Sequence, residues 1–155
     1  ILQHIREFIG RERFGSVLDV ACGTGQSSQA ALEYADRVIG MDISAEMLSQ
    51  ADPEPGIDFL QARAEELPFA EKSFDLITVG LAFHWFDQDR FLREANRVLL
   101  PSGHLVIYNS GFLDGLAIEG NPAKITKAKP ADTTIIISSN GSALRMMPNL
   151  PPAST

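Results

Sequence analysis

Short apolar runs alternate with amphipathic stretches along the first 110 residues of the chain. Apolar side chains at Leu2, Ile5 and Ile9 recur at helical spacing, and Gly10 follows where that helix would end. The runs with the length and bounds of buried strands are 16–20, 37–41, 57–61, 74–80 and 104–108, and the stretches suited to helices are 26–34, 44–51 and 87–99. The pattern therefore predicts strands that alternate with helices.

Polar residues and turn formers separate these elements. The Ser44 hydroxyl can accept a hydrogen bond from a free backbone N–H of the following helix, and Asp87 or Asp89 can cap the helix after it. We expect the ADPEPG segment at 51–56 to interrupt the chain and PSG at 101–103 to form a turn before the next strand.

The alternation indicates an α/β fold, a doubly wound and mostly parallel sheet with helices on both faces. Parallel strands need crossover connections, which are right-handed in nearly all proteins and place helices against the sheet. In sheets of this kind, ligands bind outside the carboxyl ends of the strands. We therefore expect binding residues at those strand ends.

The segment VLDVACGTG ends the first predicted strand in two glycines. Because they lack a Cβ, Gly23 and Gly25 let a ligand approach the backbone and let the turn adopt positive φ. Asp42 ends the second strand, where its carboxylate can accept two hydrogen bonds from a ribose diol. Asp19 would repel a pyrophosphate and suits a cationic ligand. These residues predict a site for a cofactor that carries a ribose.

The composition limits the classes of partner that the protein is expected to bind. A chain of 155 residues with 45% hydrophobic content has the size and composition of a single domain. A net charge of −7 argues against nucleic acid, and the apolar runs are too short for a membrane span. The single cysteine, Cys22, excludes an internal disulfide, and we expect it to be a small buried residue in a cytoplasmic protein without a metal site. Because the chain begins at Ile1, we expect a fragment or a processed product.

The chain resembles a class I S-adenosylmethionine-dependent methyltransferase in five segments that follow one another in this order: VLDVACGTG, MDISAEML, QARAEELPF, SFDLITVGLAFHWFD and FLREANRVLLPSGHLVI. The likeness is to the small-molecule branch with an HWF motif, similar to methyltransferase type 11 and trans-aconitate methyltransferase-like proteins. It implies a Rossmann-like core over residues 1–110, S-adenosylmethionine as cofactor and a small-molecule methyl acceptor.

The resemblance also implies a role for each residue at the strand ends. Asp19, Ala21, Gly23 and Gly25 would form the loop under the methionine part of the cofactor, Asp42 would hold the ribose hydroxyls, Ile43 and Met47 would pack near the adenine or ribose, Ala64 and Glu65 would flank the adenine edge, and Gly80 and Leu81 would lie beside the methyl donor. Family members often have glycine where Ala21 stands.

Several of these residues have a structural alternative. Asp42 can cap the helix that follows it, and Asp19 can bond to backbone N–H groups of its own turn. Glu65 begins an acidic turn of a kind that is often solvated, and Met47 fits a helix core. His84 follows the fourth strand, where its imidazole could take a proton from a substrate or could simply satisfy backbone groups. A carboxylate acceptor would need no such base, so the acceptor class stays open, as does the oligomeric state.

The last part of the chain departs from the resemblance. Members of this class continue after the fifth strand with a helix and an antiparallel strand pair, which residues 122–155 do not match. From Gly111 onward the chain has one aromatic residue and five of the nine prolines, so little apolar burial offsets the ordering entropy of ~1–2 kcal/mol per residue. We expect an atypical tail, poorly ordered in part, over 111–155. Residues 133–138 suit one strand, but with no second strand the fifth would be an unprotected edge.

Three hypotheses follow for the whole chain. The first is a methyltransferase that acts on a small molecule. The second is a truncated cofactor-binding fragment or pseudoenzyme, which would bind without turnover. The third is a nicotinamide-dependent oxidoreductase, which is disfavoured because Ser28 stands at the third glycine position of the GxGxxG fingerprint.

Overall fold

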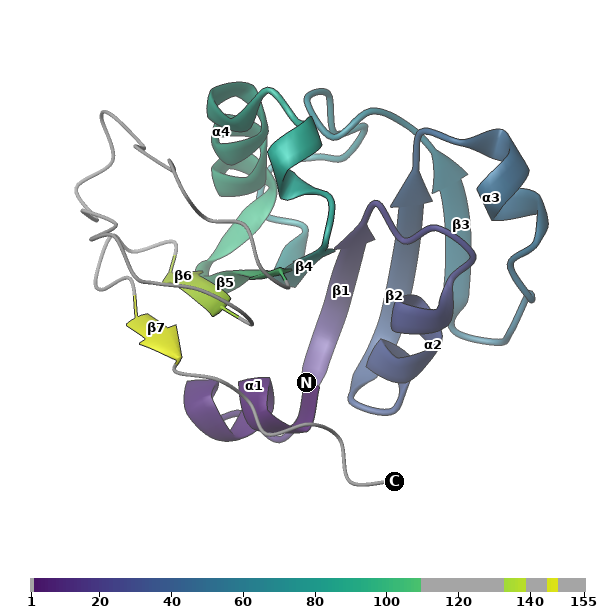
Figure 1. The fold of residues 1–155 in the computed structure, drawn as a ribbon. Helices are drawn as coiled ribbons and strands as arrows, with labels where there is room; N and C mark the ends of the chain where they lie inside the picture. Colours follow the sequence, from purple (N-terminus) through teal and green to yellow (C-terminus); the bar gives the residue numbers. More distant parts are fainter. Residues whose placement is uncertain (1, 110–132, 139–144, 148–155) are drawn as a thin grey trace.

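A seven-stranded sheet organises the part of the chain that the computed structural model describes, residues 2–109, 133–138 and 145–147 (Figure 1). Its strands are β1 (Phe14–Val20), β2 (Ala35–Asp42), β3 (Ile57–Gln61), β4 (Phe74–Gly80), β5 (Leu99–Asn109), β6 (Thr133–Ser138) and β7 (Arg145–Met147), in the spatial order β3-β2-β1-β4-β5-β6-β7. The first five strands pair in parallel, as the alternation predicts.

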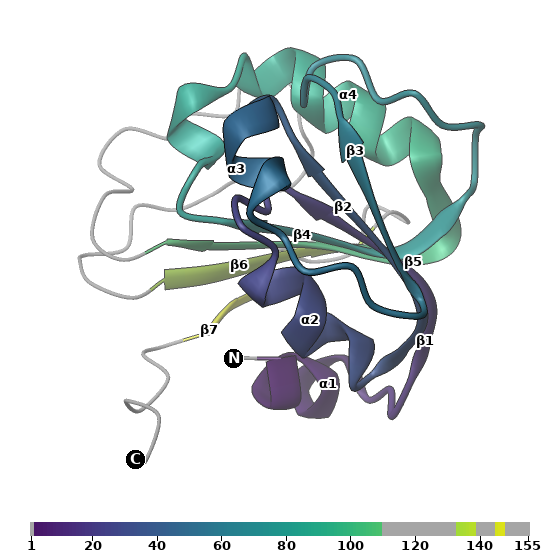
Figure 2. The same cartoon turned by 90° about the vertical axis from the view of Figure 1, so that its right-hand side faces the viewer.

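Helices cover both faces of this sheet, which confirms the doubly wound α/β fold. They are α1 (Leu2–Ile9), α2 (Gln26–Leu32), α3 (Ala45–Ser49), the 3₁₀ turn η1 (Phe83–Trp85) and α4 (Gln88–Val98). Ile5 of α1 and Ala31 of α2 pack on one face, whereas Phe91 of α4 packs on the other (Figure 2). None of these helices has the length and apolar character that a membrane span requires.

The predicted caps are confirmed, and one of two alternatives is selected. The Ser44 hydroxyl accepts a hydrogen bond from the Met47 N–H at 3.2 Å and so begins α3. At α4 the cap is Asp87, whose carboxylate accepts from the Arg90 N–H at 3.2 Å, and Asp89 lies inside the first turn. There the Asp89 charge still favours the helix, because it faces the positive end of the helix dipole.

The predicted turn at 101–103 is not a separate element, because β5 already begins at Leu99. Its pairing with β4 shifts from Phe74 opposite Leu99 to Leu76 opposite His104, so the extra residues form an irregularity inside the strand. A Cβ on Gly103 would lie 2.9 Å from Cδ2 of Leu99 and 3.0 Å from the Leu100 carbonyl oxygen. A larger residue at this position would require its neighbours to shift.

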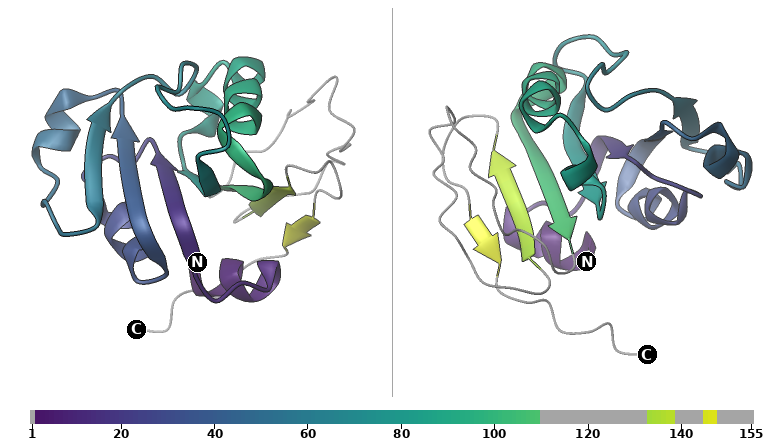
Figure 3. Two further views of the ribbon diagram at one scale, coloured as in Figure 1. Left: turned by 180° about the vertical axis from the view of Figure 1, so that it is seen from behind. Right: turned by 45° about the horizontal axis from the view of Figure 1, so that its top comes forward.

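The expectation of an unprotected fifth strand is wrong. Residues 133–138 form the predicted strand, and they pair antiparallel with β5 from His104 to Asn109 (Figure 3). A second strand, β7, pairs antiparallel with β6. Three residues are too few to display a period of two, so the sequence pattern gave no sign of β7. The predicted disorder concerns mainly residues 110–132, 139–144 and 148–155, which lie outside the described residues.

A buried carboxylate joins the amino-terminal ends of β4 and β1. Asp75 is 5% exposed, and its Oδ2 accepts hydrogen bonds from the Gly15 N–H at 2.7 Å and from Nη2 of Arg11 at 3.0 Å. Its Oδ1 accepts from the Ser16 N–H at 2.8 Å. The side chain therefore satisfies two backbone donors where β1 starts, beyond the ladder hydrogen bonds of the two strands.

We expect Asp75→Ala to lower the free energy of unfolding by about 2 kcal/mol, because it leaves two backbone N–H groups and Arg11 without the buried carboxylate that accepts from them. Urea unfolding of the full chain measures this loss. The matched control is Asp36→Ala, which removes the exposed ion pair with Arg13 (N···O 2.6 Å) and should cost less than about 1 kcal/mol. Equal losses in the two variants would contradict a structural role for Asp75.

Candidate functional site

The predicted site residues come together at the carboxyl ends of the parallel strands. Val20, the last residue of β1, pairs with Met41 of β2 and with Val79 of β4, so these three strands end at nearly the same level. The arrowheads of β1, β2 and β3 lie at one edge of the sheet, next to α3 (Figure 1). The segments after β1, β2, β3 and β4 therefore border a common region.

The loop after β1 is held in an unusual backbone conformation. Ala21, Gly23 and Gly25 all have positive φ, at 58°, 58° and 87°. The glycines adopt this region freely, as predicted, whereas Ala21 does so at a cost of about 1–2 kcal/mol. The expected preference for glycine at position 21 thus has a local cause. Backbone strain of this kind persists where the surrounding structure enforces it, which is common at functional sites.

Both glycines also make room for protein side chains. A Cβ on Gly25 would lie 2.7 Å from the Phe59 ring, and one on Gly23 would lie 3.2 Å from the Met47 methyl group. At Gly25 the absence of a Cβ therefore also accommodates Phe59, and the approach of a ligand to this backbone stays a prediction.

Asp42 ties this loop to the turn after β2. Its Oδ2 accepts a hydrogen bond from the Gly23 N–H at 2.8 Å, and its Oδ1 accepts from the Ser44 N–H at 2.9 Å. The helix cap itself is Ser44, so the capping alternative for Asp42 is not what the structure has. A carboxylate offers about four acceptor positions, and two of them are taken by these bonds. Asp42 therefore retains acceptor capacity beside the glycine loop.

Asp19 lies beneath the loop in a cage of hydroxyl groups. The residue is 1% exposed, and its carboxylate accepts hydrogen bonds from Ser27 at 2.5 Å, Ser28 at 2.7 Å and Thr78 at 2.9 Å. Burial raises the pKa of Asp19 above its usual value, the three hydroxyl bonds oppose that rise, and the charge of Asp42 adds to it. The structural alternative for Asp19, bonds to backbone N–H groups of its own turn, is not what these contacts show, because the donors are side chains from α2 and β4.

Tyr108 completes the polar cluster at the end of β5 and was not predicted. Its ring covers Gly80, where a Cβ would lie 2.6 Å from Cε2 of the tyrosine. Burial, and secondarily the charge of Asp19, raise the pKa of the Tyr108 phenol to about 12, while a hydrogen bond with Ser27 acts in the opposite direction. The available signal in the sequence was a hydroxyl at the end of an apolar strand, which by itself is common.

Leu81, the residue after β4, also has a strained backbone conformation. Its φ is 56°, its side chain is 56% exposed, and its N–H donates to the Tyr108 carbonyl oxygen at 3.0 Å. Ile43 and Met47 are exposed as well, at 61% and 41%. The expectation that Met47 belongs to a helix core is therefore wrong. It fails because α3 is a short helix without buried residues.

The first two residues of the HWF segment, His84 and Trp85, lie in η1 beyond β4, and Phe86 follows that turn. Phe83 is buried and contacts Phe86 and Phe91 edge to face, with ring centroids 6.2 and 5.9 Å apart. His84 and Trp85 are exposed, and their ring centroids are 4.8 Å apart. The phenylalanines therefore anchor the turn in the core of the α4 face, while the imidazole and the indole project from it.

The segment after β3 is less solvated than its acidic sequence suggested. Ala64 is buried, and Oε1 of Glu65 accepts a hydrogen bond from the Asp87 N–H at 3.0 Å. Cys22 is buried as predicted, and burial raises the pKa of its thiol to about 12, so the reactive thiolate is disfavoured.

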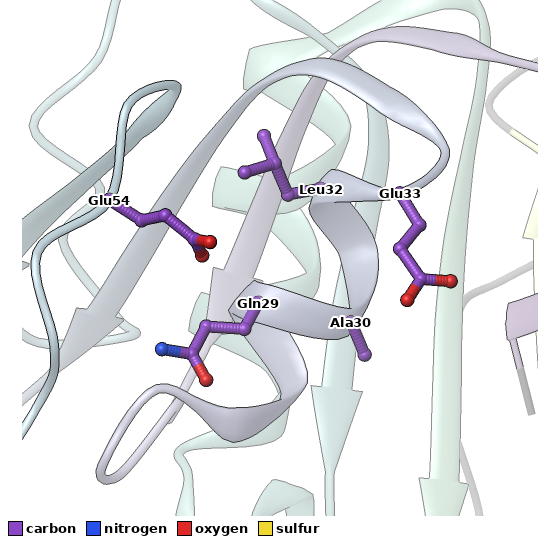
Figure 4. Close-up of a pocket in the computed structure, with 5 residues that line it drawn as sticks. All are labelled: Gln29, Ala30, Leu32, Glu33 and Glu54. Atoms are coloured by element: carbon purple, nitrogen blue, oxygen red, sulfur yellow. The ribbon is translucent and has the colours of Figure 1, made fainter.

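Other features of the described residues lie away from these strand ends. A shallow hollow of about 490 Å³ on the outer side of α2 is lined by Gln29, Ala30, Leu32, Glu33 and Glu54 (Figure 4). None of the predicted site residues lines it. Within the described residues, no group of three histidine, cysteine or carboxylate side chains could hold a metal ion.

Comparison with known proteins agrees with this arrangement. A family model described as "Methyltransferase domain" matches residues 18–107. The chain is 39% identical over 102 residues to the demethylmenaquinone methyltransferase of Chlorobaculum tepidum, covering 63% of this chain and 42% of that protein. It is 38% identical over 96 residues to the malonyl-[acyl-carrier protein] O-methyltransferase of Enterobacter lignolyticus, covering 60% and 38%.

A solved structure shows the same fold. The crystal structure of an S-adenosylmethionine dependent methyltransferase from Mesorhizobium loti is 32% identical and superposes with a TM-score of 0.61, over 70% of this chain and 53% of that one. The chain spans less than half the length of the two curated relatives above.

The raised pKa of Asp19 predicts a specific pH dependence of stability. The folded chain holds this proton more tightly than the unfolded chain, whose carboxyl titrates near 3.8. The stabilisation from this group is therefore complete below pH 3.8 and is lost as the pH rises through the raised pKa. We expect the free energy of unfolding of the native chain, relative to Asp19→Asn, to fall as the pH rises from 3.8 toward neutrality.

Urea unfolding of both proteins across this pH range measures the difference. Asp58→Asn, which removes an exposed carboxylate paired with Arg37, corrects for the loss of one negative charge. A difference between the native chain and Asp19→Asn that is constant or rises with pH would refute the assigned direction.

Proposed function

The chain belongs to the methyltransferase domain family, and from that membership we propose that it binds S-adenosylmethionine and transfers the methyl group to a small-molecule acceptor. One observation carries the proposal beyond family membership. The loop after β1, with its positive φ angles, is fixed by Asp42, and this carboxylate keeps acceptor capacity at the same strand ends. These features match what an adenosine with a cationic sulfur would require.

The residues at this edge fit such a cofactor in three respects. Asp42 would accept hydrogen bonds from the ribose hydroxyls with the acceptor positions that Gly23 and Ser44 leave free. Ile43 and Met47 are exposed apolar side chains beside it and would pack against the adenine or ribose. Ala64 and Glu65, after β3, would flank the edge of the adenine.

The methionine part would lie over the loop formed by Asp19, Ala21, Gly23 and Gly25. Asp19 and Asp42 give this region a negative potential, which favours a cationic ligand. Gly80 and Leu81 would border the methyl group, and we assign the Tyr108 ring to the same wall because it lies against Gly80. Asp19 would act through its hydroxyl cage or a water, since its side chain is enclosed.

The cofactor supplies a methyl group that is already activated on a sulfonium sulfur. The contribution of the protein is therefore mainly to hold donor and acceptor in a reactive geometry, which can supply ~7–11 kcal/mol. His84 is proposed to accept a proton from a hydroxyl or carbon acid, and Trp85 to form a wall of the acceptor site. The two curated relatives are named for different acceptors, so family membership alone does not select one.

Calorimetric titration of the 155-residue chain tests the cofactor half of the proposal. We expect S-adenosylmethionine and its product S-adenosylhomocysteine to bind with micromolar dissociation constants, because each has the ribose and adenine that the strand ends would hold. NAD should bind at least tenfold more weakly, since about 1.4 kcal/mol of repulsion between the two carboxylates and a pyrophosphate is enough. Failure of both sulfur compounds to bind would refute the proposal.

The same titration with Asp42→Asn locates the binding energy. The amide has one acceptor oxygen and cannot serve Gly23, Ser44 and the ribose together, so we expect affinity for S-adenosylhomocysteine to fall by about 10- to 100-fold. Asp58→Asn, on the exposed edge of β3, is the control and should bind as the native chain does. Unchanged affinity in Asp42→Asn would remove this residue from the site.

His84→Gln tests the acceptor half. Incorporation of labelled methyl groups is measured with a panel of phenols, other hydroxyl compounds and carboxylic acids. With acceptors that must lose a proton we expect kcat to fall by about 10²- to 10⁴-fold, whereas carboxylate acceptors and affinity for S-adenosylhomocysteine should be unaffected. An equal effect on both acceptor classes would contradict the proposed role as a base.

A further inference from the structure

The segment that follows β3 is bonded to α4 at several points along its length. The Leu67 N–H donates to Oε2 of Glu94 at 2.8 Å. Arg97 donates from Nη1 to the Phe69 carbonyl oxygen at 2.7 Å and from Nη2 to the Leu67 carbonyl oxygen at 2.9 Å. These bonds fix the middle and the end of the segment against the middle and the end of the helix.

Glu65 makes the corresponding bond at the beginning of the helix, and it differs in what it holds. Its Oε1 accepts from the N–H of Asp87, the residue that both follows HWF and caps α4. The Asp87 carboxylate is itself bonded to the Arg90 N–H. At the junction between η1 and α4, Glu65 thus binds the backbone N–H of Asp87, and the first turn of α4 binds the Asp87 side chain.

The orientation of His84 and Trp85 depends on this junction. At one end of the turn Phe83 is buried among core residues that include Ala64 and Phe91, so its place is fixed by packing. At the other end Phe86 is partly buried and packs against Phe83 and Phe91, and the Asp87 N–H is the next point of the backbone, held by a hydrogen bond to Glu65. The Glu65 side chain is 13% exposed, so the protein limits the positions that its carboxylate can take, although Asp87 itself is exposed.

We propose that Glu65 is a positioning residue that holds the His84–Trp85 turn in place and couples it to the cofactor side of the site; this inference rests on the proposed function. Glu65 follows Ala64 in the segment expected at the adenine edge. A ligand that orders this segment would therefore also order the turn through the bond to Asp87. Oε2 of Glu65 forms a long ion pair with Nε of Arg63 at 3.9 Å, and this leaves Oε1 to accept the Asp87 N–H.

Fluorescence of Trp85 tests the coupling, because it is the single tryptophan of the sequence and its side chain is 80% exposed. Emission anisotropy is measured for the full chain with and without saturating S-adenosylhomocysteine. In Glu65→Ala and Glu65→Asp we expect lower anisotropy without ligand and no rise with ligand, because aspartate is one methylene too short to reach Asp87. Glu65→Gln should behave as the native chain does, since its amide oxygen still accepts the Asp87 N–H.

Glu66→Ala is the matched control. Glu66 is the next residue, is exposed and pairs with Arg90 on the same helix at 3.3 Å, but it does not contact the junction. This variant should leave the anisotropy unchanged with and without ligand. Once an acceptor is known, Glu65→Asp should raise KM for that acceptor about tenfold, and Glu65→Gln should restore the native value, as expected for loss and recovery of one hydrogen bond that orders the site.

The outcomes separate this inference from the proposed function. If calorimetry detects S-adenosylhomocysteine binding but Trp85 anisotropy in Glu65→Asp and Glu65→Ala equals that of the native chain, the positioning role is overturned and cofactor binding stands. If the native chain does not bind the ligand, the proposed function fails, and the anisotropy of the unliganded variants still decides whether Glu65 holds the turn. Urea unfolding of each variant verifies that it is folded at the measuring temperature.

Discussion

The bond from the Asp42 carboxylate to the Gly23 N–H is the interaction on which the geometry of the candidate site depends. A loop that places Ala21, Gly23 and Gly25 at positive φ has few partners for its own backbone groups, and one of these donors is satisfied from the neighbouring strand. The same carboxylate accepts a hydrogen bond from the N–H of Ser44, the residue that caps α3. Asp42 therefore links the loop after β1 to the turn after β2.

A second carboxylate lies beneath this edge and gives it its charge. Asp19 is enclosed by hydroxyls from α2 and β4, so the strand, the helix and the loop are joined through one buried group. Ser28 has no exposed surface, and its Oγ lies 2.7 Å from where a Cβ on Gly40 would be. A serine at the third position of a dinucleotide fingerprint is thus explained by Asp19. An anionic pyrophosphate would have to lie over two carboxylates.

The sequence predicted the elements better than it predicted their connections. The strands at 57–61 and 74–80 were placed to the residue, because turn-forming or polar residues border both runs; of the two, only 74–80 is buried along nearly its whole length. Thr78 and Tyr108 were missed as partners of Asp19, since they come from strands that are 59 or more residues away and their hydroxyls look like ordinary strand residues. β7 was missed because three residues are too few to show the alternation of apolar and polar side chains that marks a strand.

The two halves of the proposed site pack against different hydrophobic clusters, one on each face of the sheet. The glycine loop, Asp19 and Tyr108 belong to the face of the sheet that α1 and α2 cover, whereas Phe83 and Phe86 anchor the His84–Trp85 turn on the α4 face. The sheet transmits little between such faces, because a strand presents alternate residues to each. Any coupling between the site of the methyl donor and the site of the acceptor must then pass around the edge of the sheet. The segment after β3 runs along that edge, and the Glu65–Asp87 bond is where it meets the acceptor turn.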